Sequence, residues 1–304
     1  MVAIVLVQTA KAEEVKIEPY PSNHWFRTEV RLHVPPRKPV GLLVLISGDI
    51  HGFSKALLPP LLASNGVMTL VTAPARAGLL ASEPMLEELD AIIGDVLGKF
   101  KVAEAKVAIG GFSAGGIGAV RYAQFCLKGE AKAHTPVAVF AVDSPLDYER
   151  WYHGAELYLQ RLALAGRDLA EDRRATNELR TALGGSPTEA ADAYRRHSPL
   201  TARLADGGNA RLLKSTPVRI YIEPEIRWRL EHWNREVFHT NIPDATALIN
   251  ILRLLGNTQA ELITTSGAGY MADGSRNPHS WSIVDERALA QWLIRWLDPG
   301  QGPR

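Results

Sequence analysis

Six short, almost continuous apolar runs recur from residue 41 onward, and amphipathic stretches separate them. The runs cover residues 41–46, 67–71, 106–109, 136–142, 218–222 and 261–265. Strands that are buried on both faces have this composition, and they occur in parallel sheets that helices cover on both sides. The alternation therefore predicts an α/β fold with a mostly parallel central sheet and helices on both of its faces.

Several of the intervening stretches have the apolar period of a helix. In residues 83–100, Leu86, Leu89, Ile93 and Val96 fall on one face, as in a helix packed on a sheet. Further helices are predicted over residues 54–64, 114–128, 244–255 and 283–297.

The N-terminal part of the chain has a different pattern. Residues 15–19 and 28–34 alternate apolar and polar side chains, and a turn containing Pro and Asn separates them. Alternation with a period of two predicts strands with one face toward solvent. We therefore expect an N-terminal antiparallel hairpin.

Residues from about 147 to 204 interrupt the alternation of strand and helix. This segment is polar and helical, and it contains no apolar strand run. We expect residues 1–147 and 205–304 to form the α/β core and residues 148–204 to form a helical cap inserted in it. The alternative is an insertion that only stabilises the fold.

Charge and cysteine content exclude several classes of function. The chain of 304 residues has 34 basic and 33 acidic side chains, a formal net charge of +1. Such a balance does not suggest nucleic acid or an anionic membrane as a partner. The single cysteine, Cys126, lies at helical spacing among apolar residues and is expected to be a buried thiol. We expect no metal and no cofactor.

The N-terminus leaves the cellular location open. No apolar run is long enough to span a bilayer. Residues 1–7 are apolar and residues 10–12 have the small-x-small form of a cleavage site, but a basic start is missing. We favour a cytoplasmic protein; residues 1–12 as a truncated export signal are the alternative.

One serine lies among four glycines in the stretch Gly110-Gly-Phe-Ser-Ala-Gly-Gly116. Gly111-Phe-Ser-Ala-Gly115 matches the G-x-S-x-G pattern, with a predicted strand before it and a predicted helix after it. A turn this tight strains the serine backbone and leaves no room for Cβ atoms at Gly111 and Gly115. We therefore predict that Ser113 is a nucleophile and that the backbone N–H of Ala114 is an oxyanion donor.

Phosphate binding is the competing interpretation of a glycine-rich turn between a strand and a helix. No Gly-Lys-Ser/Thr follows the glycines, and Arg121 stands where a dinucleotide fingerprint has glycine. The sequence therefore favours the nucleophile.

A serine nucleophile needs a base from a loop at the same edge of the sheet. Of nine histidines, His279 follows the last apolar run and precedes the last predicted helix, so it is the predicted base. His51 lies in the loop after an earlier strand and precedes the serine, so we expect it to line the site instead.

The order of strand, serine elbow, strand, helical insertion, strand, acid, strand and late histidine resembles the α/β-hydrolase fold, across the whole chain except residues 147–204. The resemblance implies an acid between Ser113 and His279. We prefer Glu225, which lies just beyond the run 218–222; Asp143, Glu223 and Asp147 are the alternatives.

The resemblance also implies a second oxyanion donor in the loop after the first parallel strand. That strand ends at Ser47-Gly48-Asp49-Ile50-His51, where the family usually has His-Gly. If Ser47-Gly48 replaces His-Gly, the second donor is the backbone N–H of Asp49.

These features predict a serine hydrolase that cleaves a small-molecule carboxylic ester through a Ser-His-acid triad and an acyl-enzyme. A peptidase or amidase, a thioesterase, a non-hydrolytic enzyme such as a lyase and a non-catalytic binding protein are the alternatives. Four aromatic residues are expected to line the substrate pocket: Trp151, Tyr152, Trp228 and Trp233.

Overall fold

A computed structural model describes residues 13–20, 28–48, 56–73, 80–101, 106–166 and 170–298. The described residues form one eight-stranded sheet with the strand order β1-β2-β4-β3-β5-β6-β7-β8. The strands are β1 (Glu13–Tyr20), β2 (Thr28–Val34), β3 (Gly41–Ile46), β4 (Val67–Ala73), β5 (Lys106–Phe112), β6 (Ala138–Val142), β7 (Val218–Ile222) and β8 (Ala260–Thr264). The order confirms the predicted architecture.

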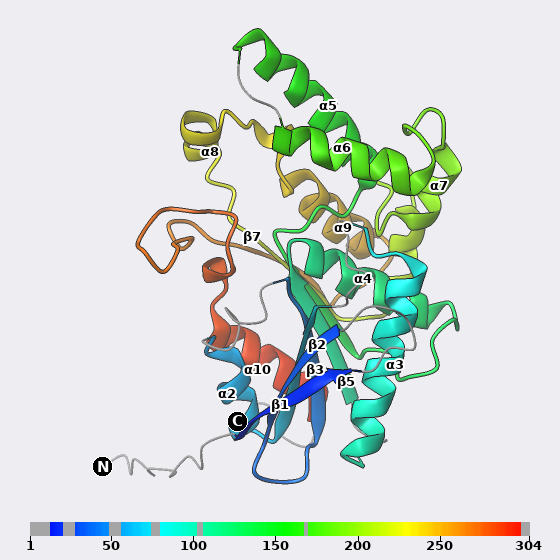
Figure 1. Ribbon diagram of the computed structural model, residues 1–304, viewed down its shortest axis with the longest axis vertical. Helices are drawn as coiled ribbons and strands as arrows, with labels where there is room; N and C mark the ends of the chain where they lie inside the picture. The colour runs from blue at the N-terminus through cyan, green and yellow to red at the C-terminus, as the bar shows by residue number, and fades with distance from the viewer. Residues whose placement is uncertain are drawn as a thin grey trace.

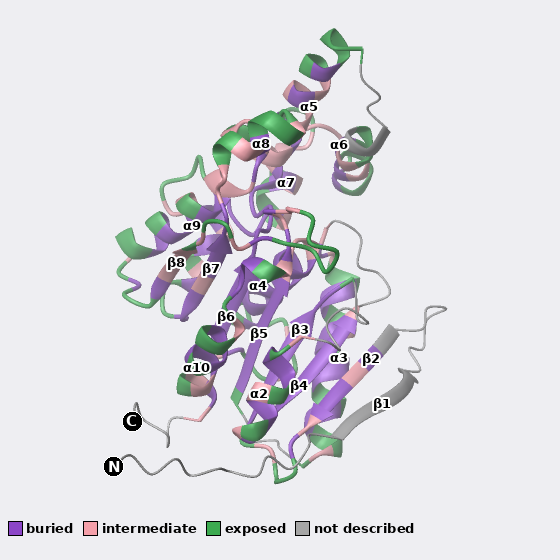
Figure 2. Cartoon of the chain, turned by 90° about the vertical axis from the view of Figure 1, so that its left-hand side faces the viewer, coloured by how far each residue is buried: buried purple, intermediate pink, exposed green. Residues whose placement is uncertain are grey.

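The sheet is parallel except at one edge. β1 and β2 pair antiparallel as the predicted hairpin, and β2 pairs antiparallel with β4. All pairs from β4 to β8 are parallel. The parallel strands β3 to β7 are buried almost throughout (Figure 2), because helices cover both faces, whereas β8 at the edge of the sheet is mostly half-buried.

Alternate residues of the parallel strands contribute to two separate apolar cores. In β3, Leu42 and Val44 belong to one core, whereas Leu43 and Leu45 belong to the other. The first core includes α3 (Glu83–Lys99), α4 (Ala114–Leu127) and α9 (Ile242–Leu254). The second includes α2 (Leu58–Ser64) and α10 (Glu286–Leu297), which lie on the other side of the sheet (Figure 1).

Three helices lie in the segment between β6 and β7 for which the sequence predicts helices. They are α5 (Tyr148–Leu164), α6 (Ala170–Leu183) and α7 (Ala191–His197). In Figure 1 they lie beyond one end of the sheet, together with α8 (Ile226–Trp233). Contacts between side chains join α5, α6 and α7. Tyr152 packs edge-on against Tyr194, and Arg180 donates a hydrogen bond to the Tyr152 hydroxyl.

The predicted helices are present, and small shifts in their bounds have local causes. The last helix begins at Glu286, not at residue 283, because the Asp285 carboxylate accepts hydrogen bonds from the Arg287 and Ala288 N–H groups and caps the helix there. The helix α9 begins at Ile242, where Pro243 occupies its first turn. Residues 54 and 55 of the first predicted helix lie outside the described residues.

The helix α8 is absent from the predicted helices. Its apolar side chains Ile226 and Leu230 are 46% and 47% exposed, so this short helix buries little of its apolar surface. In the described part of the chain, no helix combines the length and apolar character needed to cross a membrane.

Candidate active site

Ser113 occupies a sharp turn between β5 and α4. Its backbone has φ 53° and ψ −120°, a conformation that L-residues rarely adopt. The Ser113 N–H donates to the Val142 carbonyl at 2.9 Å, which fixes the turn to β6. The serine side chain remains partly exposed, as a nucleophile requires.

The two glycines of the motif are required by close backbone packing. A Cβ atom at Gly115 would lie 2.0 Å from the Ile46 carbonyl oxygen, and one at Gly111 would lie 2.4 Å from the Gly115 carbonyl carbon. The obstructing atoms are backbone, so they cannot turn aside. This packing agrees with the sequence-based expectation that no Cβ fits on either side of Ser113.

His279 comes from the loop between β8 and α10. Its Nε2 lies 3.2 Å from Ser113 Oγ, within hydrogen-bond distance. The imidazole packs against the ring of Phe112, with 4.8 Å between ring centroids. The loop therefore brings together the predicted nucleophile and the predicted base, although 166 positions separate them in the sequence.

The carboxylate beside His279 is Asp143, which directly follows β6. Asp143 Oδ2 lies 3.1 Å from His279 Nδ1. The same oxygen accepts from Arg229 Nη2 at 3.0 Å, and Oδ1 accepts from Asn241 Nδ2 at 2.8 Å. Asp143 is completely buried, so these donors replace the water that a carboxylate otherwise needs.

The environment of Asp143 keeps it ionised. Burial alone would raise the pKa of this carboxyl group. The charges of His279 and Arg229 and their hydrogen bonds outweigh burial and lower the pKa below its ordinary value. An ionised Asp143 can hold the Nδ1–H tautomer of His279, which leaves Nε2 free to accept a proton from Ser113.

Glu225, the acid preferred from the sequence, has other partners. Its carboxylate accepts from Ser266 Oγ at 2.9 Å and from the Gly267 N–H at 2.8 Å, and it pairs with Arg276. The preference for Glu225 over Asp143 therefore does not match the geometry.

The reason is the strand order. β6 is the immediate neighbour of β5, so the residue after β6 lies next to the serine turn. Glu225 follows β7, one strand further away.

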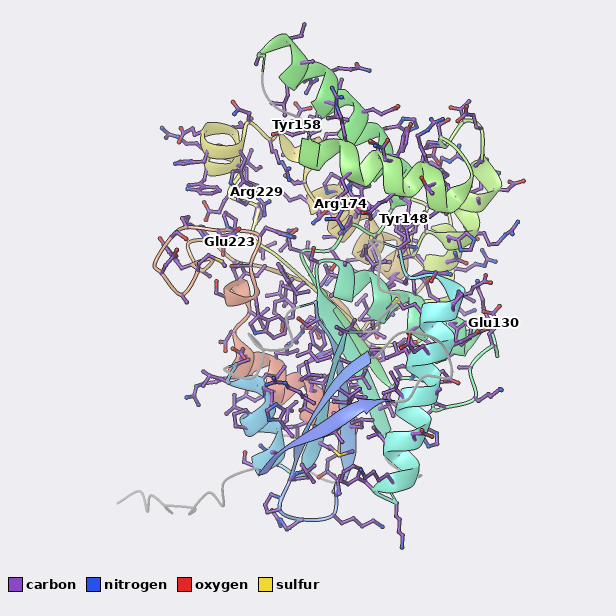
Figure 3. All side chains as sticks on the ribbon, in the orientation of Figure 1. Glu130, Tyr148, Tyr158, Arg174, Glu223 and Arg229 are labelled. Atoms are coloured by element: carbon purple, nitrogen blue, oxygen red, sulfur yellow. The ribbon has the colours of Figure 1, made fainter. Side chains whose placement is uncertain are left out.

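The remaining candidate acids also have structural partners. Glu223 is buried and accepts from the Ala268 and Gly269 N–H groups, and Arg276 forms an ion pair with it. Figure 3 shows Glu223 next to the loop that leads to His279. Asp147 caps α5 and binds the Ala202 N–H. Glu223 therefore holds the histidine loop, and Asp147 holds the start of α5.

Arg229 and Asn241 were not identified from the sequence. Besides Asp143, Arg229 Nη2 donates to the Glu223 carbonyl at 2.9 Å and to the Pro278 carbonyl at 3.4 Å. The Arg229 side chain thus joins Asp143, the residue after β7 and the histidine loop. No motif marks either residue, because both come from the segment after β7 and meet the site only in the fold.

One of the two predicted oxyanion donors lies within the described residues. Ala114 is the first residue of α4, so its N–H has no acceptor within the helix and is available beside Ser113. Asp49, the second predicted donor, and His51 lie outside the described residues. Ser47, just before them, is bound through its N–H to the Thr72 carbonyl at 3.0 Å.

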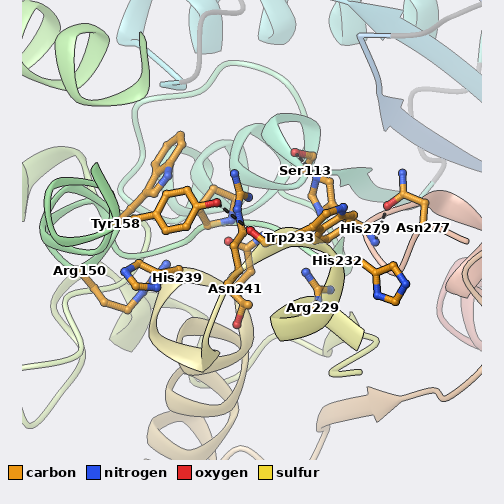
Figure 4. A pocket seen from close by; sticks show the side chains of 14 residues that line it. Ser113, Arg150, Tyr158, Arg229, His232, Trp233, His239, Asn241, Asn277 and His279 are labelled. Atoms are coloured by element: carbon orange, nitrogen blue, oxygen red, sulfur yellow. Dashed lines mark hydrogen bonds between the residues drawn. The ribbon is translucent and has the colours of Figure 1, made fainter. Parts of the chain in front are cut away.

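A pocket of about 600 Å³ opens beside Ser113 and His279. Its walls include Trp151 of α5, and Tyr158 of α5 and Trp233 of α8, which are labelled in Figure 4. Two of the four aromatic residues predicted for the pocket, Trp151 and Trp233, therefore line it.

The other two aromatic residues have different surroundings. Tyr152 is buried between helices, and its hydroxyl accepts from Arg180. Trp228 stacks on His232 with 4.5 Å between ring centroids and 10° between ring planes. Within the described ranges, no group of three or more His, Cys, Asp or Glu side chains is arranged to hold a metal ion.

Comparison with solved structures identifies the fold. The acylaminoacyl peptidase of Pyrococcus horikoshii matches with a TM-score of 0.61 and 12% identity, over 98% of this chain and 43% of that chain. An esterase of Pyrococcus furiosus matches with a TM-score of 0.57 and 12% identity, over 94% and 92% of the two chains. MPT51 of Mycobacterium tuberculosis matches with a TM-score of 0.61 and 13% identity, over 94% and 99%.

These similar structures share the α/β-hydrolase fold, and the present chain has that fold. It spans less than half the length of the peptidase. No protein-family model and no curated protein sequence matches the chain.

Proposed function

We propose that this protein is a serine hydrolase that cleaves a carboxylic ester through an acyl-enzyme. The observation that carries the proposal is the continuous contact from Ser113 Oγ to His279 Nε2 at 3.2 Å and from His279 Nδ1 to Asp143 Oδ2 at 3.1 Å. This is the geometry of a nucleophile, a general base and an orienting carboxylate. The catalytic acid of the proposal is therefore Asp143.

In the first half-reaction, His279 Nε2 takes the proton of Ser113 Oγ while the oxygen forms a bond to the substrate carbonyl carbon. The tetrahedral oxyanion accepts hydrogen bonds from the N–H groups of Ala114 and Asp49. His279 then returns the proton to the alcohol oxygen, and the bond between carbonyl carbon and alcohol breaks. Asp143 stabilises the transient imidazolium and stays ionised throughout.

In the second half-reaction, water takes the place of the alcohol. His279 accepts a proton from water, hydroxide adds to the acyl carbon, and Ser113 leaves with that proton. Each oxyanion donor contributes about 100- to 1000-fold to the rate. The helices from 148 to 204 serve in this proposal as a cap, with Trp151 of α5 contributing to the pocket wall.

Ester is the proposed substrate class, and amide and thioester are the alternatives. Similar structures carry the names esterase and peptidase, so hydrolysis of an activated carbonyl is the common element. A peptidase or amidase would cleave a matched p-nitroanilide as well as the ester, and a thioesterase would prefer the matched thioester. A non-catalytic binding protein would react with none of them.

The experiment is the replacement Ser113→Ala. The unchanged protein should hydrolyse p-nitrophenyl esters and should become covalently labelled by a fluorophosphonate. Ser113→Ala should abolish labelling and lower kcat by at least about 10,000-fold. Ser64→Ala is the matched control, since Ser64 is exposed at the end of α2, on the other face of the sheet. Activity that survives in Ser113→Ala would refute the proposal.

A further inference from the structure

Asn241 immediately precedes α9 and lines the pocket. An asparagine at this position commonly caps the helix by accepting hydrogen bonds from its first N–H groups, but the Asn241 side chain makes no capping bond. It turns instead to Asp143. Its Nδ2 donates to Asp143 Oδ1 and to the Asp143 backbone carbonyl oxygen, each at 2.8 Å. In Figure 4, Asn241 lies between Tyr158 and His279.

The two partners of Asn241 determine how its amide is oriented. A backbone carbonyl oxygen and an ionised carboxylate only accept hydrogen bonds, so the Asn241 atom that contacts them must be the NH₂ nitrogen. The reversed amide would place an acceptor against two acceptors. Asn241 Oδ1 is therefore the atom that does not contact Asp143.

Asn241 Oδ1 is an accessible acceptor without a partner in the described part of the protein. It accepts no hydrogen bond from any described residue. The side chain is half-buried in the pocket wall, and Oδ1 retains accessible surface there. Because Nδ2 donates to an anion, the amide is polarised and its oxygen becomes a stronger acceptor. A ligand in the pocket can therefore donate a hydrogen bond to Oδ1.

The other asparagine of the pocket wall, Asn277, has its oxygen already occupied. Asn277 Oδ1 accepts from the His279 N–H at 2.9 Å. Asn277 is likewise half-buried. The two asparagines therefore differ in one respect that matters for a ligand: only Asn241 has a free amide oxygen.

The surroundings of Asn241 favour an uncharged donor. Arg229 Nη2 binds Oδ2 of the same carboxylate whose Oδ1 binds Asn241. The guanidinium balances the charge of Asp143, so this pair leaves no net negative charge to hold a cation, and the nearby arginine repels one. An amide N–H or a hydroxyl donates without carrying a charge.

We infer that the substrate carries an uncharged N–H or O–H group and that Asn241 Oδ1 accepts a hydrogen bond from it while Ser113 attacks the ester carbonyl. This inference rests on the proposed function. It makes Asn241 a specificity-determining residue, because an analogue without the donor displaces water from Oδ1 and supplies no partner in return.

Pairs of esters that differ by one donor test the inference. In one arm, the p-nitrophenyl esters of N-acetylglycine, N-acetyl-β-alanine and N-acetyl-γ-aminobutyrate are each compared with the ester in which a methylene group replaces the N–H. In the other arm, butyrate monoesters of diols of increasing length are compared with their methyl ethers by butyrate release. Each rate is divided by that of hydroxide-catalysed hydrolysis, which removes differences in intrinsic reactivity.

In at least one pair, kcat/KM for the ester with the donor should exceed that of its partner by about tenfold or more. The arm that contains this pair distinguishes an amide N–H from a hydroxyl. The length at which the preference occurs gives the spacing between the donor and the scissile carbonyl.

The preference should depend on Asn241. Asn241→Ala should bring the ratio within the pair to near one. Both esters of a pair use the same serine, histidine and acid, so a general loss of activity caused by a disturbed Asp143 cancels in the ratio. Asn277→Ala is the matched control, because it removes an amide of the same pocket whose oxygen is occupied. It should leave the ratio unchanged, whatever it does to kcat.

Binding measurements provide the same comparison without turnover. Ser113→Ala should bind the intact ester with the donor about tenfold or more tightly than its partner, as measured by Kd. In the double variant that also contains Asn241→Ala, the two Kd values should be nearly equal. This readout applies even if Asn241→Ala is too slow to assay, and cooperative urea unfolding shows that each variant is folded.

Two results would overturn the inference in distinguishable ways. If the esters are hydrolysed in a Ser113-dependent manner but every pair agrees within about threefold, or if the preference survives in Asn241→Ala, the donor site fails and the proposed hydrolase stands. If no ester is hydrolysed and no fluorophosphonate label forms, the proposed function fails and the inference fails with it.

Discussion

Arg229 and Asp143 form a buried ion pair in which Nη2 lies 3.0 Å from Oδ2, across 86 positions of sequence. Their side chains are 4% and 0% exposed. The same carboxylate oxygen lies 3.1 Å from His279 Nδ1. Asp143 therefore divides its charge between an arginine and the histidine of the proposed triad. Arg229 therefore fixes in place the carboxylate that also contacts His279.

The choice between Asp143 and Glu225 is open to a direct comparison. Asp143→Asn should reduce kcat by about 10,000-fold, because an amide no longer favours the Nδ1–H tautomer of His279. Glu225→Gln should change kcat by less than about tenfold, since its partners are Ser266, Gly267 and Arg276. Steady-state hydrolysis of a p-nitrophenyl ester measures both. A large loss in Glu225→Gln with a mild one in Asp143→Asn would restore Glu225 as the acid.

Arg229→Gln should alter the dependence of stability on pH. In the folded protein the pKa of Asp143 lies below its ordinary value. Ionised Asp143 therefore stabilises the fold above about pH 3.9, and this stability is lost as the pH falls through the depressed pKa. Without Arg229, burial is less opposed and the folded pKa rises, so the loss begins at a higher pH.

The measurement for Arg229→Gln is urea unfolding across the acidic range. Breaking one side of a buried pair should also lower the free energy of unfolding at neutral pH by about 3–5 kcal/mol. Arg227→Gln on the same helix is the control, with an expected change below about 1 kcal/mol, because Arg227 pairs with Glu231 on an exposed surface. If the pH at which stability is lost on acidification is the same in Arg229→Gln as in the unchanged protein, the role given to the arginine is contradicted.

Glu223→Gln tests the support of the histidine loop. The amide that replaces the carboxylate cannot accept from both the Ala268 and Gly269 N–H groups and also pair with Arg276. We expect kcat to fall by about 10- to 100-fold through misplacement of His279, with KM little changed. Glu261→Gln is the control, since the Glu261 side chain is 34% exposed and its pair with Arg219 lies within the sheet. Equal effects of the two replacements would contradict a positioning role.

Gly115→Ala should destabilise the fold and abolish activity together. The added Cβ would lie 2.0 Å from the Ile46 carbonyl oxygen, so strand or helix must shift, at a cost of about 3 kcal/mol or more. Gly94→Ala is the matched control, because Gly94 lies within α3 with open space around it, and alanine there should stabilise by about 0.5–1 kcal/mol. Urea unfolding separates the two. A stable, active Gly115→Ala variant would show that the turn is less tightly packed.

Cys126 should be inert in the folded protein. Burial raises the pKa of its thiol to about 12, although a hydrogen bond with Tyr122 acts in the opposite direction. The reactive thiolate is therefore almost absent at neutral pH. Ellman's reagent should react with the native protein only at the rate of unfolding and should react at once in denaturant. A fast reaction with the folded chain would contradict the buried position.

The architecture could be predicted from the sequence, because apolar runs and turn residues are signals that neighbouring positions of the chain carry. Each of the six runs became a strand, and the glycines around Ser113 correctly predicted a strained turn. The position of His279 beside Ser113 was also predictable, since His279 stands between the last strand and the last helix.

Asp143 and its partners were harder to predict from the sequence, because their positions depend on which strands are neighbours in the sheet. Asp143 and Glu225 both follow strands and both have a left-handed backbone, with φ 42° and 36°. Only the order of strands distinguishes them, and that order is a property of the whole sheet. Arg229 comes from the short helix α8, and its contact with Asp143, 86 positions away, exists only in the fold.

Arg229 lines the pocket and also binds the acid. Because one side chain has both roles, the shape of the pocket at this position cannot change independently of the surroundings of Asp143. Trp151 and Tyr158 belong to α5, and replacing them reshapes the wall without removing a ligand of Asp143. A new substrate that requires space at position 229 instead disturbs the acid and the histidine loop at the same time. Libraries that seek altered specificity should therefore vary α5 and leave Arg229 unchanged.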